Sequence, residues 1–271
     1  MNQNHSIAPT TDRNAKHIPI NEDFLWGLHP VLAVLEESPD RVHEILLLQG
    51  RKGNKLEELI RKARENHIKV TFHSAFKISG KVDGELRHQG VFARVTAVPL
   101  LSLSQLVERF RERIEKGEKP RIIVCDSLQD PHNLGAIIRS AVASGACGVL
   151  TTRERSVPLG GTVAKASVGA VSSIDICQVT NLVNALKELK KAGAWVFGAV
   201  KESKAQSLYA TDLRLPACIV VGSEGQGIRN LVQSECDFLV SIPMIGKLDS
   251  LNSSVAAAVI LFEALRQNLQ T

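Results

Sequence analysis

Short apolar runs alternate with amphipathic stretches from residue 121 to the end of the chain, and this alternation constrains the fold more than any other feature. The runs predict strands and the stretches predict helices, because apolar side chains recur there at helical spacing. Strands that alternate with helices imply an α/β fold with a mostly parallel sheet covered on both faces. The predicted strands are residues 121–126, 148–151, 174–179, 195–200, 217–222 and 238–243, and the predicted helices are 134–144, 181–192 and 253–267.

The segment before this region shows a shorter succession of the same kind. Residues 24–98 contain two helical and three strand-like patterns and are predicted to form a small α/β domain. Residues 99–119 are densely charged outside one apolar stripe, which predicts a helical connector. Residues 1–23 are polar and are predicted to be a flexible tail. Residues 120–271 form the larger, second domain.

Composition excludes some classes of protein and leaves others open. The 33 Lys and Arg against 28 Asp and Glu give a net charge of +5, which is compatible with a polyanionic partner but does not demonstrate one. No apolar run is long enough to span a membrane, and the first residues lack the apolar region of a signal peptide, so we expect a cytoplasmic protein. The five cysteines are odd in number and lie in or beside apolar runs, so we expect buried thiols and neither disulfides nor a metal site.

Three polar loops follow predicted strands of the larger domain. They are residues 130–135, which lead into the helix that carries Arg139, and residues 222–227 and 242–255. Parallel α/β sheets bind ligands in the loops beyond the carboxyl ends of their strands. These loops are therefore the candidate site.

The glycine spacing of the second loop argues against a dinucleotide-binding fold. That fold, like the common methyltransferase fold, needs its glycine-rich turn after the first strand of the domain. Here the glycines of residues 222–227 come late in the domain and are spaced G-x-x-G-x-G. A nicotinamide-dependent oxidoreductase is therefore disfavoured, and such a cluster by itself is more often a tight turn than a site.

Several candidate residues also have simpler explanations. Arg139 lies off the apolar stripe of its helix and could be an ordinary surface arginine. Asn133, Asn252 and Ser253 stand at or near predicted helix starts, where they could act as N-caps. Only the combination of the three loops points to a common function.

Taken together, the three loops resemble the three motifs of the SpoU family of RNA methyltransferases, in order and at suitable spacing. The match comprises Asn133 with Arg139 six residues later, residues 221–227 and residues 242–256, within a region of about residues 121–267. The resemblance implies transfer of a methyl group from S-adenosylmethionine to a ribose 2′-hydroxyl of RNA. It also implies a trefoil knot, which strand order alone would not suggest, and a homodimer with the site near the interface.

The resemblance also implies which residues form the site. In the family, the cofactor is held mainly by the backbone of three loops, which here fall at residues 198–202, 222–227 and 242–251. We expect a glycine at position 222 because a side chain there would crowd the ligand. The implied cofactor-binding residues are Gly198, Gly222, Gly227, Ile242, Met244, Leu251 and Ser253, and the implied catalytic residues are Arg139, Asn133, Glu224, Asn252 and Ser250.

The family assigns Arg139 a part in activating the hydroxyl. Because an arginine essentially never deprotonates in a protein, we interpret it as a cation that grips the target phosphate and stabilises the developing alkoxide. Asn133 and Glu224 would hold Arg139 and the ribose, and Glu224 is an alternative proton acceptor. Asn252 and Ser250 would fix the third loop.

The smaller domain resembles a substrate-binding domain. Residues 27–30 (GLHP) and 88–91 (HQGV) are similar to that of the bacterial large-subunit rRNA guanosine 2′-O-methyltransferases. This implies a guanosine of the peptidyl-transferase P loop of 23S rRNA as target, in naked rRNA or in a precursor of the large subunit. A transfer-RNA methyltransferase and a catalytically inactive assembly factor are the alternatives. The candidate phosphate-binding cations are Arg51, Lys52, Lys55, Arg153 and Arg155.

Overall fold

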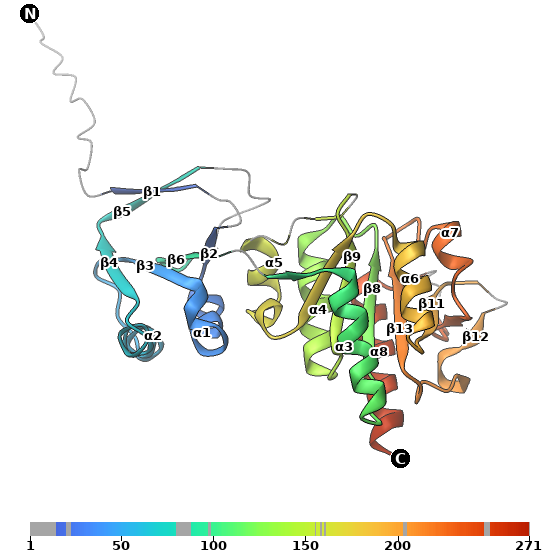
Figure 1. Ribbon diagram of the computed structural model, residues 1–271. Coiled ribbons are helices and arrows are strands. Elements are labelled where there is room, and N and C mark those ends of the chain that lie inside the picture. The colour runs from blue at the N-terminus through green and yellow to red at the C-terminus, as the bar shows by residue number, and fades with distance from the viewer. Residues whose placement is uncertain are drawn as a thin grey trace, which may run out of the picture. The chain divides into compact units, whose positions relative to one another are not determined.

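The computed structural model describes residues 15–19, 23–79, 88–96, 99–154, 156–157, 159, 161–202, 205–246 and 250–270. The chain divides into two units between Thr96 and Ala97, and each is described by itself (Figure 1). Among the described helices, none combines the length and the apolarity that crossing a bilayer requires.

The second unit is built on a fully parallel sheet. Its strand order is β12-β14-β11-β13-β8-β9-β10-β7, and every neighbouring pair in this described sheet is parallel. The predicted α/β class with a mostly parallel sheet is therefore confirmed. The strands are β7 (Leu100–Leu101), β8 (Arg121–Asp126), β9 (Gly148–Thr152), β10 (Asp175–Val179), β11 (Trp195–Ala199), β12 (Gln206–Ser207), β13 (Ala217–Gly222) and β14 (Phe238–Ser241).

Helices cover both faces of this sheet (Figure 1). One face carries α3 (Leu103–Glu115), α6 (Leu182–Lys191) and α7 (Asn230–Gln233), and the other carries α4 (Pro131–Ala143), α5 (Gly161–Ala166) and α8 (Ser253–Leu269). Short 3-10 turns lie at Ala170–Ser172 and Leu208–Ala210.

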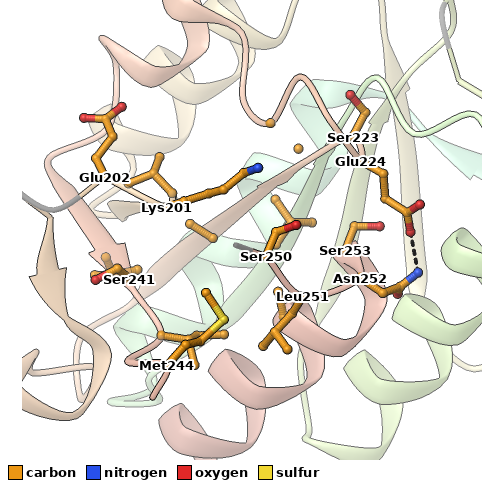
Figure 2. Close-up of a pocket in the computed structure, with 18 of the residues that line it drawn as sticks. Lys201, Glu202, Ser223, Glu224, Ser241, Met244, Ser250, Leu251, Asn252 and Ser253 are labelled. Carbon is orange, nitrogen blue, oxygen red and sulfur yellow. Dashed lines mark hydrogen bonds between the residues drawn. The ribbon is translucent and has the colours of Figure 1, made fainter. Parts of the chain in front are cut away.

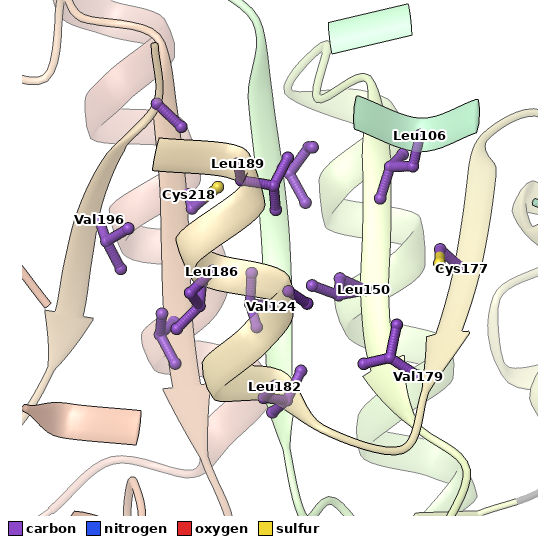
Figure 3. Packing of buried hydrophobic residues seen from close by; sticks show 14 of the residues in the cluster. Leu106, Val124, Leu150, Cys177, Val179, Leu182, Leu186, Leu189, Val196 and Cys218 are labelled. Carbon is purple, nitrogen blue, oxygen red and sulfur yellow. The ribbon is translucent and has the colours of Figure 1, made fainter. Parts of the chain in front are cut away.

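The core under the first set of helices follows from helical spacing. Leu182, Leu186 and Leu189 recur on one side of α6 and are fully or almost fully buried. They pack with Leu106 of α3 and with strand side chains such as Val124 (Figure 3). Continuous apolar runs are required in the strands because both faces are covered.

The segment predicted to be a connector is part of this unit. Ser102 caps α3 through a capping box with Gln105, so the predicted helix is present. However, Phe110 is 1% exposed in the core, and β7 pairs with β10. Residues 100–115 thus extend the sheet and cover it, which corrects the prediction that they only join two domains. The apolar stripe of α3 had signalled a helix without showing what it packs against.

The first unit has a smaller, mixed sheet. Its order is β2-β6-β3-β4, in which β6 runs antiparallel to both neighbours and β3 runs parallel to β4. Two helices contact each other and this sheet. The elements are β2 (Phe24–Trp26), α1 (Leu28–Glu37), a 3-10 turn (Pro39–Arg41), β3 (Val42–Leu48), α2 (Asn54–Glu65), β4 (Lys69–His73) and β6 (Val91–Val95).

A two-stranded ribbon also belongs to the first unit. Strand β1 (Ala15–Pro19) pairs in parallel with β5 (Ala75–Ser79). Ile18 is fully buried and packs with Trp26 and Phe92. The prediction of a flexible tail over residues 1–23 is therefore wrong for these five residues, because one apolar side chain in a short polar segment gives no periodic signal.

Candidate functional site

A cavity of about 660 Å³ lies at the carboxyl ends of β11, β13 and β14 (Figure 2). Its lining comes from residues 199–202, 221–227, 240–246 and 250–256. Because all three strands are parallel, their carboxyl ends meet at one edge and bring these distant segments together. Its volume is in the range of small-molecule and cofactor sites.

The glycine loop closes on itself as a tight turn. The Gly227 amide donates to the Ser223 carbonyl over 2.9 Å, and Gly225 and Gly227 have positive φ values of 87° and 66°. A Cβ on Gly222 would lie 2.0 Å from the Gly227 carbonyl carbon and 2.3 Å from the Ile228 nitrogen. The loop backbone, and not a ligand, therefore requires glycine at position 222, which corrects the reason given by the sequence analysis.

Three polar residues from three loops bond to one another beside the cavity. The Asn133 Nδ2 donates to Glu224 Oε1 over 3.0 Å, and the Asn252 Nδ2 donates to Asn133 Oδ1 over 3.0 Å. Asn252 also donates to Glu224, as the dashed line in Figure 2 shows. We call this set the amide–carboxylate cluster. It ties the start of α4 to the glycine loop and to the start of α8.

Helix N-capping, the simpler explanation for Asn133 and Asn252, is wrong for the first and confirmed for the second. Asp130, and not Asn133, is the N-cap of α4, since its side chain accepts from the His132 amide over 2.9 Å and Pro131 opens the helix. Asn252 does cap α8, accepting from the Ser254 amide through Oδ1, while its Nδ2 serves the cluster. One side chain therefore performs both tasks.

Arg139 is not brought to the cavity. It is exposed on α4, and neither a hydrogen bond nor an ion pair joins it to the residues that the structure describes. Asn133 and Glu224 bond to each other and to Asn252, and among the described residues neither bonds to Arg139, so the hypothesis that they hold Arg139 stays a prediction. Its guanidinium is instead open to solvent and to an incoming ligand.

Five of the expected residues of the third loop line the cavity, and one expected glycine does not. The lining residues are Ile242, Met244, Ser250, Leu251 and Ser253. Gly198 lies within β11, where a Cβ would approach Cys236 Sγ to 2.7 Å, so its role is packing.

Ser253 provides a test of whether the cavity fits a polar ligand. The residue is 7% exposed, and its hydroxyl oxygen has no hydrogen-bond partner within the described part of the chain. A buried, unpaired hydroxyl carries a free-energy cost unless a ligand or water satisfies it. The cavity therefore offers a polar group to an occupant with donors and acceptors, such as a nucleoside.

Two features of this edge escaped the sequence analysis. Lys201 lines the cavity and points across it towards Ser250 in Figure 2. Asp126, at the end of β8, is fully buried and pairs with Arg229 beyond the glycine loop. A charged residue directly after a buried strand was the available signal for Asp126, whereas nothing in the sequence marks its distant partner.

The predicted phosphate-binding cations are distributed as follows. Arg51 and Lys52 are exposed before α2, and the Lys55 Nζ lies 2.8 Å from His29 Nε2. Arg153 donates from Nε to the Gln178 carbonyl over 3.4 Å. Arg155 lies outside the described residues. The described residues contain no cluster of three or more side chains suited to a metal ion.

The fold and the cavity define a parallel α/β protein with a nucleoside-sized site at the carboxyl edge of its sheet. Residues 120–262 match the SpoU rRNA methylase family, and residues 24–101 match the substrate-binding domain of RNA 2′-O ribose methyltransferases. The chain belongs to the SpoU rRNA methylase family.

Relatives and solved structures cover both units. The 23S rRNA (guanosine-2′-O-)-methyltransferase RlmB of Shewanella oneidensis is 39% identical over 91% of this chain and 98% of its own length. RlmB of Xanthomonas campestris pv. campestris is 41% identical over 91% and 97%. The SpoU methyltransferase AviRb from Streptomyces viridochromogenes, solved in complex with the cofactor AdoMet, aligns with a TM-score of 0.70 at 24% identity, covering 92% of this chain and 91% of its own. This last likeness supports the fold.

Proposed function

We propose that this protein transfers a methyl group from S-adenosylmethionine to the ribose 2′-hydroxyl of a guanosine in 23S rRNA. The carrying observation is that two of the SpoU motif loops line one cavity, and that Asn133 of the remaining motif bonds to Glu224 and Asn252 of those loops. The relatives quoted above are named for this reaction. Neither a transfer-RNA target nor an inactive assembly factor is favoured by them.

The cavity residues fit the cofactor. The bound cofactor supplies a methyl group already activated as a sulfonium, so the protein has to align the acceptor hydroxyl and relieve it of its proton. The glycine turn and residues 242–251 would enclose the adenosine, and the unpaired Ser253 hydroxyl would bond to it. The amide–carboxylate cluster would hold the loops in register while the ribose approaches.

Arg139 is proposed as the catalytic cation. Its exposed guanidinium is free to grip the phosphate beside the target ribose and to stabilise the alkoxide as the proton leaves. Glu224 already accepts amide hydrogens from two asparagines, which favours a positioning role for it over that of proton acceptor. Ser250 would fix the third loop at the mouth of the cavity.

The two units would divide the work. We propose residues 24–98 as the RNA-binding domain, with the exposed Arg51 and Lys52 among its phosphate contacts, and residues 120–271 as the methyltransferase domain. Acting on ribosomal RNA, the protein would work in the cytoplasm, on 23S rRNA or a large-subunit precursor.

A trefoil knot and a homodimer complete the proposal. The knot is supported by the return of the chain after β14 to Asn252, which bonds within the earlier loops; tracing the chain in an experimental density map would test it. The dimer is supported by Val255, Phe262 and Leu269, exposed apolar residues seven apart on α8. A Phe262→Glu variant that remained dimeric in sedimentation would contradict this interface.

Two experiments test the function directly. Calorimetry against S-adenosylmethionine, S-adenosylhomocysteine and NAD should show binding of the first two only. Mapping of 2′-O-methyl groups across cellular rRNA, with and without the gene, should show the loss of one 23S guanosine modification. An unchanged 23S map with a missing methyl group in transfer RNA would reassign the substrate.

A further inference from the structure

Arg229 is anchored at the carboxyl edge of the sheet in an unusual manner. It follows the glycine loop, and its backbone amide donates to Asp126 Oδ2 over 2.9 Å. Its side-chain Nε donates to the other carboxylate oxygen over 2.7 Å. The Ser127 hydroxyl adds a third bond to Asp126 over 3.1 Å. Three donors therefore hold one carboxylate.

The bonds to Asp126 fix the guanidinium of Arg229 through Nε but do not use its two Nη groups. Asp126 is fully buried, whereas the Arg229 side chain is 36% exposed. Neither Nη group bonds to any residue that the structure describes. Because a guanidinium is planar, a bond at Nε orients the whole group. Four N–H donors are thus held in a fixed direction at the protein surface.

A purely structural ion pair would use the arginine differently. Arg214 shows the alternative, since it donates from both Nε and Nη2 to the two oxygens of Asp212, each over 2.9 Å. In that fork the side chain bonds to both carboxylate oxygens, and the Arg214 backbone amide adds a bond to Asp212 Oδ1 over 3.0 Å. In the Asp126 pair, Oδ2 accepts from the backbone amide of Arg229. The corresponding oxygen of Asp212 accepts from Nη2 of Arg214. The fork of Arg229 therefore remains available to a second anion.

The surroundings of Arg229 suit a polyanion. Strand β8 lies between β13 and β9 in the sheet, so Asp126 ends beside the glycine loop. Arg153 follows β9, and Lys201 follows β11 at the same edge. The neighbouring carboxylates of Glu224 and Glu202 accept hydrogen bonds from amide side chains. Cations with free donors thus stand along the edge where the RNA must reach the cavity.

We propose that Arg229 binds a phosphate of the RNA substrate and that Asp126 is the residue that positions it. This proposal rests on the proposed function, because it assumes that RNA approaches the carboxyl edge of the second unit. The Asp126 carboxylate offsets the charge of Arg229, so the contact depends on directed N–H donors as well as on charge. Arg229 would fix the RNA beside the cavity without contacting the cofactor.

The variant Arg229→Gln separates anchoring from phosphate binding. Glutamine places its Nε2 where arginine has Nε, so it keeps a donor for Asp126 and removes only the charge and the outer fork. Arg214→Gln is the matched control, an ion-paired arginine outside the carboxyl edge. The probes are an unmodified 23S rRNA transcript for filter binding and S-adenosylhomocysteine for calorimetry.

We expect Arg229→Gln to weaken RNA binding by about tenfold, with S-adenosylhomocysteine affinity within about twofold of the wild type. The slope of log K against log salt should decrease in magnitude by about 0.7–0.9, the loss of one phosphate contact. Arg214→Gln should change neither quantity. Asp126→Asn alone should lower RNA affinity. The double variant Asp126→Asn/Arg229→Gln should bind RNA about as weakly as Arg229→Gln alone, as expected for a residue that acts through Arg229.

The outcomes distinguish the possible failures. Wild-type RNA affinity and salt slope in Arg229→Gln would overturn the phosphate contact. A joint loss of RNA and S-adenosylhomocysteine binding with an unchanged salt slope would show that Arg229 only supports the glycine loop, which also overturns it. If the wild-type protein bound neither probe, the proposed function itself would fail.

Discussion

The two units use β-sheets in opposite ways. In the first unit β6 runs antiparallel to β2 and β3, so loops leave that four-stranded sheet at both ends. In the second unit all pairs of the described sheet are parallel, and the loops after β11, β13 and β14 meet at one cavity. A parallel sheet therefore brings its loops together at one edge, whereas the first unit carries exposed cations such as Arg51 in the segment between β3 and α2.

The proposed division of work places the cofactor site in the second unit and most of the phosphate contacts in the first. The cavity is bordered by a closed turn and by the hydrogen-bonded amide–carboxylate cluster. Phosphate contacts tolerate looser geometry because much of the attraction is electrostatic.

The largest effect is expected at the glycine turn. Gly222→Val would force a side chain into the backbone at Gly227 and Ile228, so we expect loss of measurable S-adenosylmethionine binding together with a stability loss of about 1–3 kcal/mol. Calorimetry and thermal unfolding check both. A folded Gly222→Val protein with near-normal affinity would remove the turn from the site.

The next effect concerns catalysis without binding. Arg139→Ala and Arg139→Lys should both reduce the methylation rate by about two to four orders of magnitude, because a charge-stabilising fork is lost. Calorimetry should show unchanged S-adenosylhomocysteine affinity, since Arg139 does not line the cavity. If lysine supported wild-type turnover with a pH profile shifted towards its own titration, Arg139 would be an acid–base group.

Removal of the first unit should affect RNA binding alone. A protein that begins at Pro99 retains β7 and the whole parallel sheet, so S-adenosylmethionine should bind as in the full chain. RNA affinity should fall by at least about tenfold, and the remaining affinity should depend less steeply on salt. Normal methylation of rRNA by the shortened protein would show that the two units do not divide the work.

The smallest effect should come from the thiols, all of which lie in the second unit. Burial raises the pKa of Cys125 and Cys236 to about 12 and that of Cys147 and Cys177 to about 11, and it raises the pKa of Cys218 further. Because these values exceed the ordinary 9.0 of the unfolded chain, the thiols should resist iodoacetamide at pH 8 in the native state. Stability should be unaffected below pH 9 and should decline as the pH rises above it. Rapid native alkylation, followed by mass spectrometry, would contradict a closed core.

The sequence predicted the interior strands accurately and the edge elements poorly. The bounds of β8 and β13 coincide with the predicted ones because apolar runs there have clear ends. Strands β1, β5 and β12 were missed, since short or exposed strands bury few side chains and so carry little pattern.

The candidate site shows the same division. The sequence located the residues of the amide–carboxylate cluster, because the motif as a whole was recognisable. It could not show that Asn133 turns inwards while Asp130 caps α4, since both residue types are good caps and they stand only three residues apart. Nor could it reveal the Asp126–Arg229 pair, which exists only through the placement of β13 beside β8.

The place of β13 in the sheet also governs how the protein reaches its native state. It lies between β8 and β11, so a strand made after both of its neighbours must pair between them, and of the described strands only β14 follows it in the chain. Until β13 pairs between them, β8 and β11 each lack the strand that is their neighbour in the native sheet. Non-local pairings of this kind are slow to form, because the chain loses the entropy of loop closure before the new contacts stabilise the pairing. Refolding should consequently be slow, and cofactor binding should be among the last properties to return.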